Sequence, residues 1–328
     1  MTHPSPLNRS SEAKILNNLG ITYGNLGQYA QALVHHQQAL VILRELRGTF
    51  LGDQAYTTEA QTLNNIGLVY ASQGEYARSL EYFQQALTIH QKLNNPEQAT
   101  TLTNIGTVYN SQGQYARALE YHQQALAIHQ KINARAKVAA NLNNIGSVYS
   151  NQGNYPQALE YYQQSLAIVR EIGDKAGEMT SLNSIGNIHS DQGRYAQALE
   201  FYQKSLAIAK EIGARSEETT ALGNIGTVYG NRGNFSQAIE YHQQTLAIRK
   251  EMGDRDGEST ALNNTALNYS NQGEYAKALE LQQQALNIAQ EIGDKAGEAS
   301  YLSSMGSVYT RLGGKWAIAT GKVWHWVD

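Results

Sequence analysis

The chain has 328 residues, of which 25 are lysine or arginine and 28 are aspartate or glutamate, so its formal net charge is −3. A charge so close to neutral gives no reason to expect a nucleic acid or an acidic membrane surface as the partner. Because the sequence contains no cysteine, it excludes disulfides, thiolate metal sites and a cysteine nucleophile.

Residues 1–12 come before the first helical pattern, and we expect them to be disordered. The segment from Met1 to Lys14 has neither the basic start nor the apolar core of a signal peptide. No stretch of the chain approaches the roughly 18 apolar residues that a membrane span requires. We therefore expect a cytoplasmic protein without a membrane partner.

One pattern of about 40 residues recurs between residues 13 and 313, and LNNIGSVYSNQGNYPQALEYYQQSLAI, which begins at Leu142, is typical of it. Two series of glycines mark the copies, with successive steps of 47, 39 and then 40 residues. The first series is Gly20, Gly67, Gly106, Gly146, Gly186, Gly226 and Gly306, with Ala266 at the seventh position, and the second is Gly27, Gly74, Gly113, Gly153, Gly193, Gly233, Gly273 and Gly313.

Each copy predicts two helices, here named helix A and helix B. Leu142 and Tyr149 are seven residues apart on one stripe, which predicts helix A, and Gly153 ends that helix in a left-handed conformation. Helix B follows from Tyr155 for about 17 residues. The next helix A is expected to begin near Lys175, with Asp174 as its N-cap.

Small and large residues alternate on the faces where A and B meet. Gly146 and Ala158 allow the two backbones to approach, while Tyr149 and Tyr155 fill the space beside them. Leucine begins the helix A stripe in every copy, which predicts that this position is a buried packing position. These leucines are Leu16, Leu63, Leu102, Leu142, Leu182, Leu222, Leu262 and Leu302.

The repeat is irregular in three places. The first period has seven extra residues between Arg44 and Tyr56, which predicts either a longer surface loop or an extended helix B, and the second is one residue shorter, with Pro96 between helices. In the seventh unit Thr265, Ala266 and Asn268 replace the usual Ile, Gly and Val, so we expect weaker packing there.

Residues 314–328 do not continue the pattern and contain all three tryptophans, Trp316, Trp324 and Trp326. Three interpretations remain open for this tail: a non-native sequence produced by truncation or a change of reading frame, a cap over the last helices, or an aromatic binding element. Since a solenoid needs a polar terminal cap, the first interpretation predicts weak self-association through the C-terminal end.

Titratable groups do not gather as catalysis requires. His36, His122 and His242 occupy one helix B position that holds Phe or Tyr in other copies, and this is typical of a packing site. Glutamates recur singly, one repeat apart, and lysines and arginines are dispersed. We therefore expect no enzyme, no catalytic residue, no cofactor, no metal site and no nucleic-acid partner.

With Leu142, Ile145, Gly146, Tyr149, Ala158 and Tyr162 in the positions of the family signature, the chain resembles a tetratricopeptide repeat (TPR) array of the 40-residue type, as in Pins/LGN-like and kinesin-light-chain-like proteins. Leucine stands where the family usually has tryptophan. The resemblance implies an all-α fold, a right-handed α-solenoid of antiparallel helix pairs in a TPR superhelix. It implies seven full repeats and the first helix of an eighth over residues 13–313.

In such arrays helix A lines the concave side, and here its exposed positions are rich in asparagine. An amide can pair with the N–H and C=O of an extended backbone, so we expect a scaffold or adaptor that binds a partner peptide in the groove. Alternatively, the asparagines only bond one another across adjacent A helices, or the array is a spacer or self-assembly module within a signalling protein. The candidate residues are Asn18, Asn65, Asn104, Asn144, Asn224 and Asn264, with Asn110, Asn151, Asn231 and Asn271.

Overall fold

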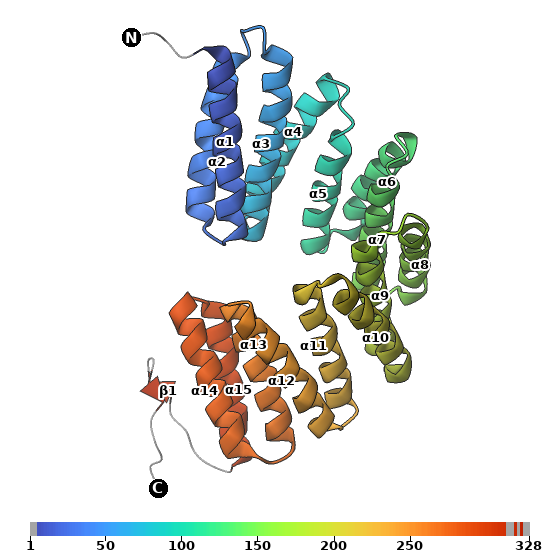
Figure 1. Cartoon of the computed structure of the whole chain (residues 1–328), viewed down its shortest axis with the longest axis vertical. Coiled ribbons are helices and arrows are strands. Elements are labelled where there is room, and N and C mark those ends of the chain that lie inside the picture. The colour runs from blue at the N-terminus through green and yellow to red at the C-terminus, as the bar shows by residue number, and fades with distance from the viewer. Residues whose placement is uncertain (1–4, 313–317, 320–321, 324–328) are drawn as a thin grey trace. The chain divides into compact units, whose positions relative to one another are not determined.

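The computed structural model describes residues 5–312, 318–319 and 322–323 (Figure 1). It contains two compact units, Met1–Asp174 and Lys175–Asp328. The first holds α1 (Pro6–Asn25), α2 (Tyr29–Leu46), α3 (Gly52–Ser72), α4 (Tyr76–Lys92), α5 (Gln98–Ser111), α6 (Tyr115–Lys131), α7 (Arg135–Asn151) and α8 (Tyr155–Glu171). The second holds α9 (Lys175–Asp191), α10 (Tyr195–Ile212), α11 (Arg215–Asn231), α12 (Phe235–Glu251), α13 (Arg255–Asn271), α14 (Tyr275–Ile292) and α15 (Lys295–Arg311).

The expected series of helix pairs is confirmed. Odd-numbered helices are the A helices and even-numbered ones the B helices, and within each unit every helix packs on the next one along the chain. The tail adds one feature that the all-α prediction omits, an antiparallel pair of short strands, β1 (Ile318–Ala319) and β2 (Lys322–Val323). The three tryptophans of the tail lie outside the described residues, so the interpretations of that segment stay open.

The prediction that residues 1–12 are disordered is wrong for residues 6–12, which form the first turns of α1. Ser5 caps the helix, because its hydroxyl oxygen accepts a hydrogen bond from the backbone N–H of Asn8, and Pro6 occupies the first turn, where proline is favoured. Arg9 then pairs with Glu12 on its own helix and with Glu45 on α2. These contacts fix a segment that has no apolar periodicity.

The glycines have the two roles that the pattern suggests. Gly153 has a φ of 73°, in the left-handed region where a side chain is disfavoured. Gly146 is buried inside a helix, and a β-carbon there would lie 2.7 Å from the ring of Tyr162 on helix B. Gly67 faces Phe83 and Gly106 faces His122 in the same way. Glycine on A and a ring on B therefore form one packing pair.

The leucine position is buried wherever a repeat has neighbours on both sides. The six leucines from the second to the seventh copy are at most 5% exposed, whereas Leu16 and Leu302 in the first and last copies are half-buried. The prediction of a packing position is therefore confirmed for the interior of the array.

The seven extra residues of the first period do not extend helix B appreciably. α2 ends at Leu46, and most of the insertion lies in a longer connection and in an earlier start of α3, at Gly52. Glu59, which is 1% exposed on α3, pairs with Arg47 at 2.5 Å and with Arg44 at 3.3 Å. This pairing joins the inserted turn to the helix that follows it.

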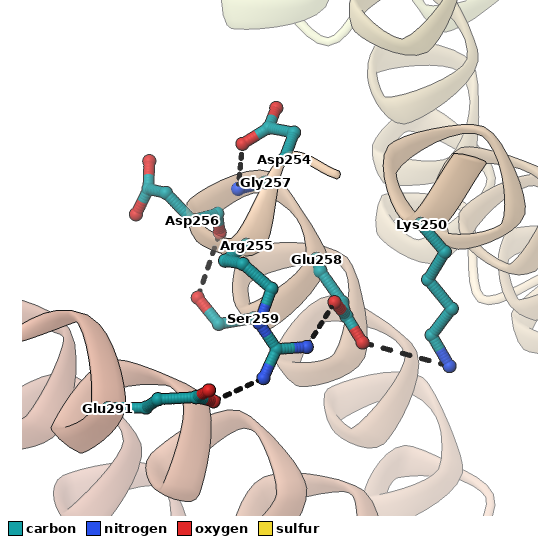
Figure 2. A network of polar contacts seen from close by, with 8 residues as sticks. All are labelled: Lys250, Asp254, Arg255, Asp256, Gly257, Glu258, Ser259 and Glu291. Atoms are coloured by element: carbon teal, nitrogen blue, oxygen red, sulfur yellow. Dashed lines mark hydrogen bonds and ion pairs between the residues drawn. The ribbon is translucent and has the colours of Figure 1, made fainter. Parts of the chain in front are cut away.

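The connection that lengthens the repeat to 40 residues is held by ion pairs (Figure 2). Arg255, at the start of α13, pairs with Glu258 on its own helix and with Glu291 at the end of α14. The side-chain oxygen of Asp254 accepts a hydrogen bond from the N–H of Gly257 at 2.9 Å, as an N-cap does. The two ion pairs, but not the cap, recur with Arg215, Glu218 and Glu251. Because the arginines are exposed to solvent, each pair contributes little to stability.

The seventh repeat has an unusual core. Ala266 takes the place of the packing glycine, and Gln282 takes the place of the ring opposite it. The Gln282 side chain is fully buried, and among the residues that the structure describes neither of its amide atoms has a hydrogen-bond partner. Thr265 and Asn268 are buried too, and the Asn268 amide donates to the carbonyl oxygen of Asn264 at 2.8 Å. A buried amide without a partner destabilises this repeat.

Replacing Gln282 with methionine, which has nearly the same shape, should stabilise the second unit by about 1–3 kcal/mol because it removes the unpaired amide. Urea denaturation followed by circular dichroism measures the change. The neighbouring exposed Gln284→Met is the matched control and should change stability by less than about 0.5 kcal/mol. A loss of stability in Gln282→Met would contradict the assignment, since it would mean that the amide is satisfied in solution.

Candidate peptide-binding surface

The candidate surface is the exposed side of the A helices, named here the A-helix face. It carries the repeat positions of Asn144 and Asn151. In the first unit the helices α1, α3, α5 and α7 touch in succession, and in the second unit α9, α11, α13 and α15 do the same. Neighbouring copies of a position therefore lie on adjacent helices, so each unit presents a row of polar side chains.

The structure pairs some of the candidate asparagines with each other. The Asn65 amide donates to Asn17 at 3.2 Å, and the Asn104 amide donates to Asn64 at 3.1 Å. Each bond joins an A helix to the preceding one, and its acceptor lies one residue before the equivalent position in that helix. These bonds match the alternative in which asparagines bond one another across adjacent A helices.

The second row behaves similarly where it pairs at all. The Asn151 amide donates to Asn110 at 3.1 Å, again from one A helix to the preceding one. Asn271 accepts a hydrogen bond from the guanidinium of Arg311 on α15 at 3.0 Å. Four of the ten candidates are thus donors or acceptors in bonds to other asparagines, and a fifth is bound to arginine.

The remaining five amides are unengaged. Within residues 5–312, no side-chain hydrogen bond is made by Asn18, Asn144, Asn224, Asn231 or Asn264. The cause is visible in two cases. By the same offset, the acceptor for Asn144 would stand at position 103 of the preceding A helix, and the acceptor for Asn264 at position 223. These positions hold Thr103 and Gly223 instead of asparagine. These two substitutions leave amides of the A-helix face available to an external backbone.

Aromatic stacks between helices A and B were not predicted from the sequence. Tyr149 stacks on Tyr161 with ring centroids 5.5 Å apart, and equivalent pairs occur in the five other repeats with rings at both positions, among them Tyr109 with Tyr121. Burial, then the neighbouring phenol, raises the pKa of Tyr121 and Tyr161. An aromatic residue just before the Tyr162 position in all but the last full copy was the signal that could have revealed them.

No catalytic constellation emerges in the described part of the chain. Among these residues, no three histidine, aspartate or glutamate side chains lie close enough together to hold a metal ion. Burial raises the pKa of Tyr202 to about 12, and its hydroxyl donates to Asn187 at 2.7 Å, so it is a neutral structural group. None of the helices that the structure describes has the length and apolar character to span a bilayer.

Comparison with solved structures places this fold among repeat proteins. A STAND signal-transduction ATPase from Pyrococcus horikoshii, which has a tetratricopeptide repeat sensor, matches with a TM-score of 0.64 at 16% identity, covering 92% of this chain and 45% of its own. Nearly identical TPR-like repeats of a Podosopora anserina putative kinesin light chain match with a TM-score of 0.51 at 19% identity, covering 60% and 97%. A Rap protein complexed with competence and sporulation factor matches with a TM-score of 0.56 at 14% identity, covering 93% and 99%.

Family models agree with the geometry. No curated protein matches the sequence. Models described as tetratricopeptide repeat match residues 13–50, 58–131, 137–211, 178–251, 217–291 and 257–319. Matches to tetratricopeptide repeats along the chain indicate a protein-interaction scaffold. From the paired A and B helices, the glycine packing pairs and these matches along most of its length, the chain belongs to the tetratricopeptide repeat family.

Proposed function

We propose that this protein is a non-enzymatic scaffold that binds an extended, uncharged segment of a partner protein along the A-helix face. The observation that carries the proposal is the set of unengaged amides, Asn144 in the first unit and Asn224 and Asn264 in the second. Amides that only completed helix packing would be bonded to their neighbours, as Asn65 and Asn104 are.

The spacing of the A helices suits an extended chain. Adjacent packed helices lie roughly 8–10 Å apart, and an extended segment advances about 3.3 Å per residue. One amide per repeat would therefore meet every third residue of a bound segment. Because an amide offers both a donor and an acceptor to the peptide backbone, such contacts favour extended shape over a particular sequence. Because few of the residues at the repeat positions of Asn144 and Asn151 are charged, this face favours an uncharged segment.

The similar structures are consistent with this role without assigning a partner. The Rap protein was solved bound to competence and sporulation factor, and the repeats of the archaeal ATPase are described as its sensor. We propose that this chain acts as an adaptor in cytoplasmic signalling.

The test is selection of a phage-displayed 12-residue peptide library on the full chain, followed by calorimetric titration of the enriched peptides. The triple variant Asn144→Ala, Asn224→Ala and Asn264→Ala should bind an enriched peptide about tenfold more weakly or worse, whichever unit the peptide occupies, since it removes amide contacts in each unit. Its melting temperature should stay that of the wild type, because these side chains have no partner within residues 5–312.

The matched control is the pair Asn104→Ala and Asn151→Ala, which removes amides already bonded within the chain. This control should lose about 0.5–1.5 kcal/mol of stability per bond and change peptide affinity less. Recovery of no peptide, together with mass that rises with concentration in light scattering, would overturn the proposal in favour of the self-assembly alternative.

A further inference from the structure

A hollow of about 140 Å³ opens on the A-helix face of the first unit, between α1 and α3. Ile21 and Leu68 give it apolar walls, Asn25 and Asn65 provide amides, and His36 of α2 also lines it. Among the described residues that line it, none carries a carboxylate, an ammonium or a guanidinium group. We name this feature the N-terminal hollow.

Its apolar walls come from two adjacent A helices. Ile21 and Leu68 occupy one repeat position and are 40% and 42% exposed, which is unusual for large apolar side chains. The next two A helices of the same unit carry Thr107 and Ser147 at that position. Within the first unit, therefore, two exposed apolar side chains face the same space only between α1 and α3.

A glycine helps to keep the space open. Gly24 lines the hollow, and a β-carbon built on it would meet only ordinary contacts, 3.8 Å from Val69 and 3.9 Å from Ala32. Later A helices have Asn110 and Ser150 at the same repeat position. Since Gly24 has no side chain, the volume that those residues would fill remains free.

The imidazole of His36 contributes a hydrogen-bond acceptor. The carbonyl oxygen of the Asn17 side chain accepts from the Asn65 amide and lies 2.9 Å from Nδ1 of His36, so Nδ1 must carry the proton. Nε2 is then left with its lone pair, and it has no hydrogen-bond partner within residues 5–312. Burial lowers the pKa of His36 to about 4, so the ring is neutral at pH 7 and Nε2 stays an acceptor.

We propose that the N-terminal hollow binds an uncharged aliphatic side chain of the partner segment, of about valine or leucine size, while an N–H of the same segment donates to Nε2 of His36. The inference rests on the proposed function, because the segment is the one that follows the A-helix face. A charged side chain is excluded because it would lose its hydration without gaining a counter-charge. The hollow thus sets specificity for a segment that the amides hold mainly by its backbone.

N-acetyl-leucinamide is the probe, since it is an uncharged leucine side chain with amide N–H groups and nothing else. Titrated into full-length protein with isotope-labelled Ile and Leu methyl groups, it should shift the Ile21 and Leu68 signals saturably, with a dissociation constant in the millimolar range. N-acetyl-glycinamide, which lacks the side chain, should leave both signals in place, as should the charged N-acetyl-aspartamide.

Gly24→Leu is the variant that fills the hollow while preserving the fold. Leucine has a higher helix propensity than glycine, and a β-carbon at this position has room. It should weaken the probe about tenfold or more and leave the melting temperature unchanged or higher. Gly223→Leu is the matched control on α11, where a β-carbon meets nothing within 4 Å. It should bind the probe as the wild type does.

Two results would overturn the inference: methyl signals that do not move with N-acetyl-leucinamide, or equal shifts in Gly24→Leu and in the wild type. Neither result bears on the amides, which the peptide selection tests separately. Conversely, probe binding that survives in the triple asparagine variant while that variant loses peptides would support both proposals.

Discussion

Acidification from pH 7 to pH 4 is expected to cost the folded chain about 3 kcal/mol for each of three histidines. Burial lowers the pKa of His36, His122 and His242 from 6.5 to about 4, and each side chain is at most 2% exposed. Above pH 6.5 the rings are neutral in both the folded and the unfolded chain, so they do not affect stability. As the pH falls from 6.5 to 4 only the unfolded chain takes up the protons, and stability is lost over that window.

The measurement is urea denaturation at a series of pH values for the wild type and for the double variant His122→Phe and His242→Phe. Phenylalanine suits the position, because Phe83 faces Gly67 in the second repeat as His122 faces Gly106 in the third. Carboxylates titrate alike in both proteins, so the difference between the two curves isolates the histidines. Parallel curves from pH 6.5 to pH 4 would show that these rings are hydrated in the folded protein.

Leu182→Ala should destabilise the second unit by about 2–5 kcal/mol. Leu182 begins the α9 stripe, is 1% exposed and is among the largest fully buried side chains. Truncation removes its apolar contacts and leaves a cavity between helices that cannot fully close. Thermal melting followed by circular dichroism should show a lower midpoint for the transition that includes α9.

Leu267→Ala is its matched control, since Leu267 also lies on an A helix of the second unit but is 40% exposed. This change should alter stability by less than about 0.5 kcal/mol. An unchanged midpoint for Leu182→Ala would refute the burial of the leucine stripe, and equal losses in the two variants would show that burial does not decide the effect.

The seventh repeat shows how much of the packing between helices A and B can be predicted from the sequence pattern. Its sequence shows a decayed stripe at Thr265, Ala266 and Asn268, which predicted weaker packing. On the other helix Gln282 replaces the ring, and at the equivalent Gly146 a β-carbon would lie 2.7 Å from the ring of Tyr162, so an alanine and a ring do not fit together at this pair of positions. The substitution on helix B was visible in the sequence, but only the A-to-B contact connects it with the one on helix A.

The sequence by itself determined the repeat, the two helices of each unit, the left-handed glycines and the buried leucines. All of these follow from spacing along one helix or from the conformation of one residue, and both are local. The helix over residues 6–12 was missed because a side-chain cap, an ion pair within α1 and an ion pair to α2, rather than apolar periodicity, hold it.

Only the tertiary structure decided which amides are engaged. The bonds Asn65 to Asn17 and Asn104 to Asn64 run diagonally between adjacent A helices, so the period of the repeat does not predict them. The same holds for the N-terminal hollow, which Ile21 and Leu68 line from adjacent A helices and which no side chain fills at Gly24. Contacts between repeats depend on how neighbouring helices are offset, and that offset is set by the packing of whole helix pairs.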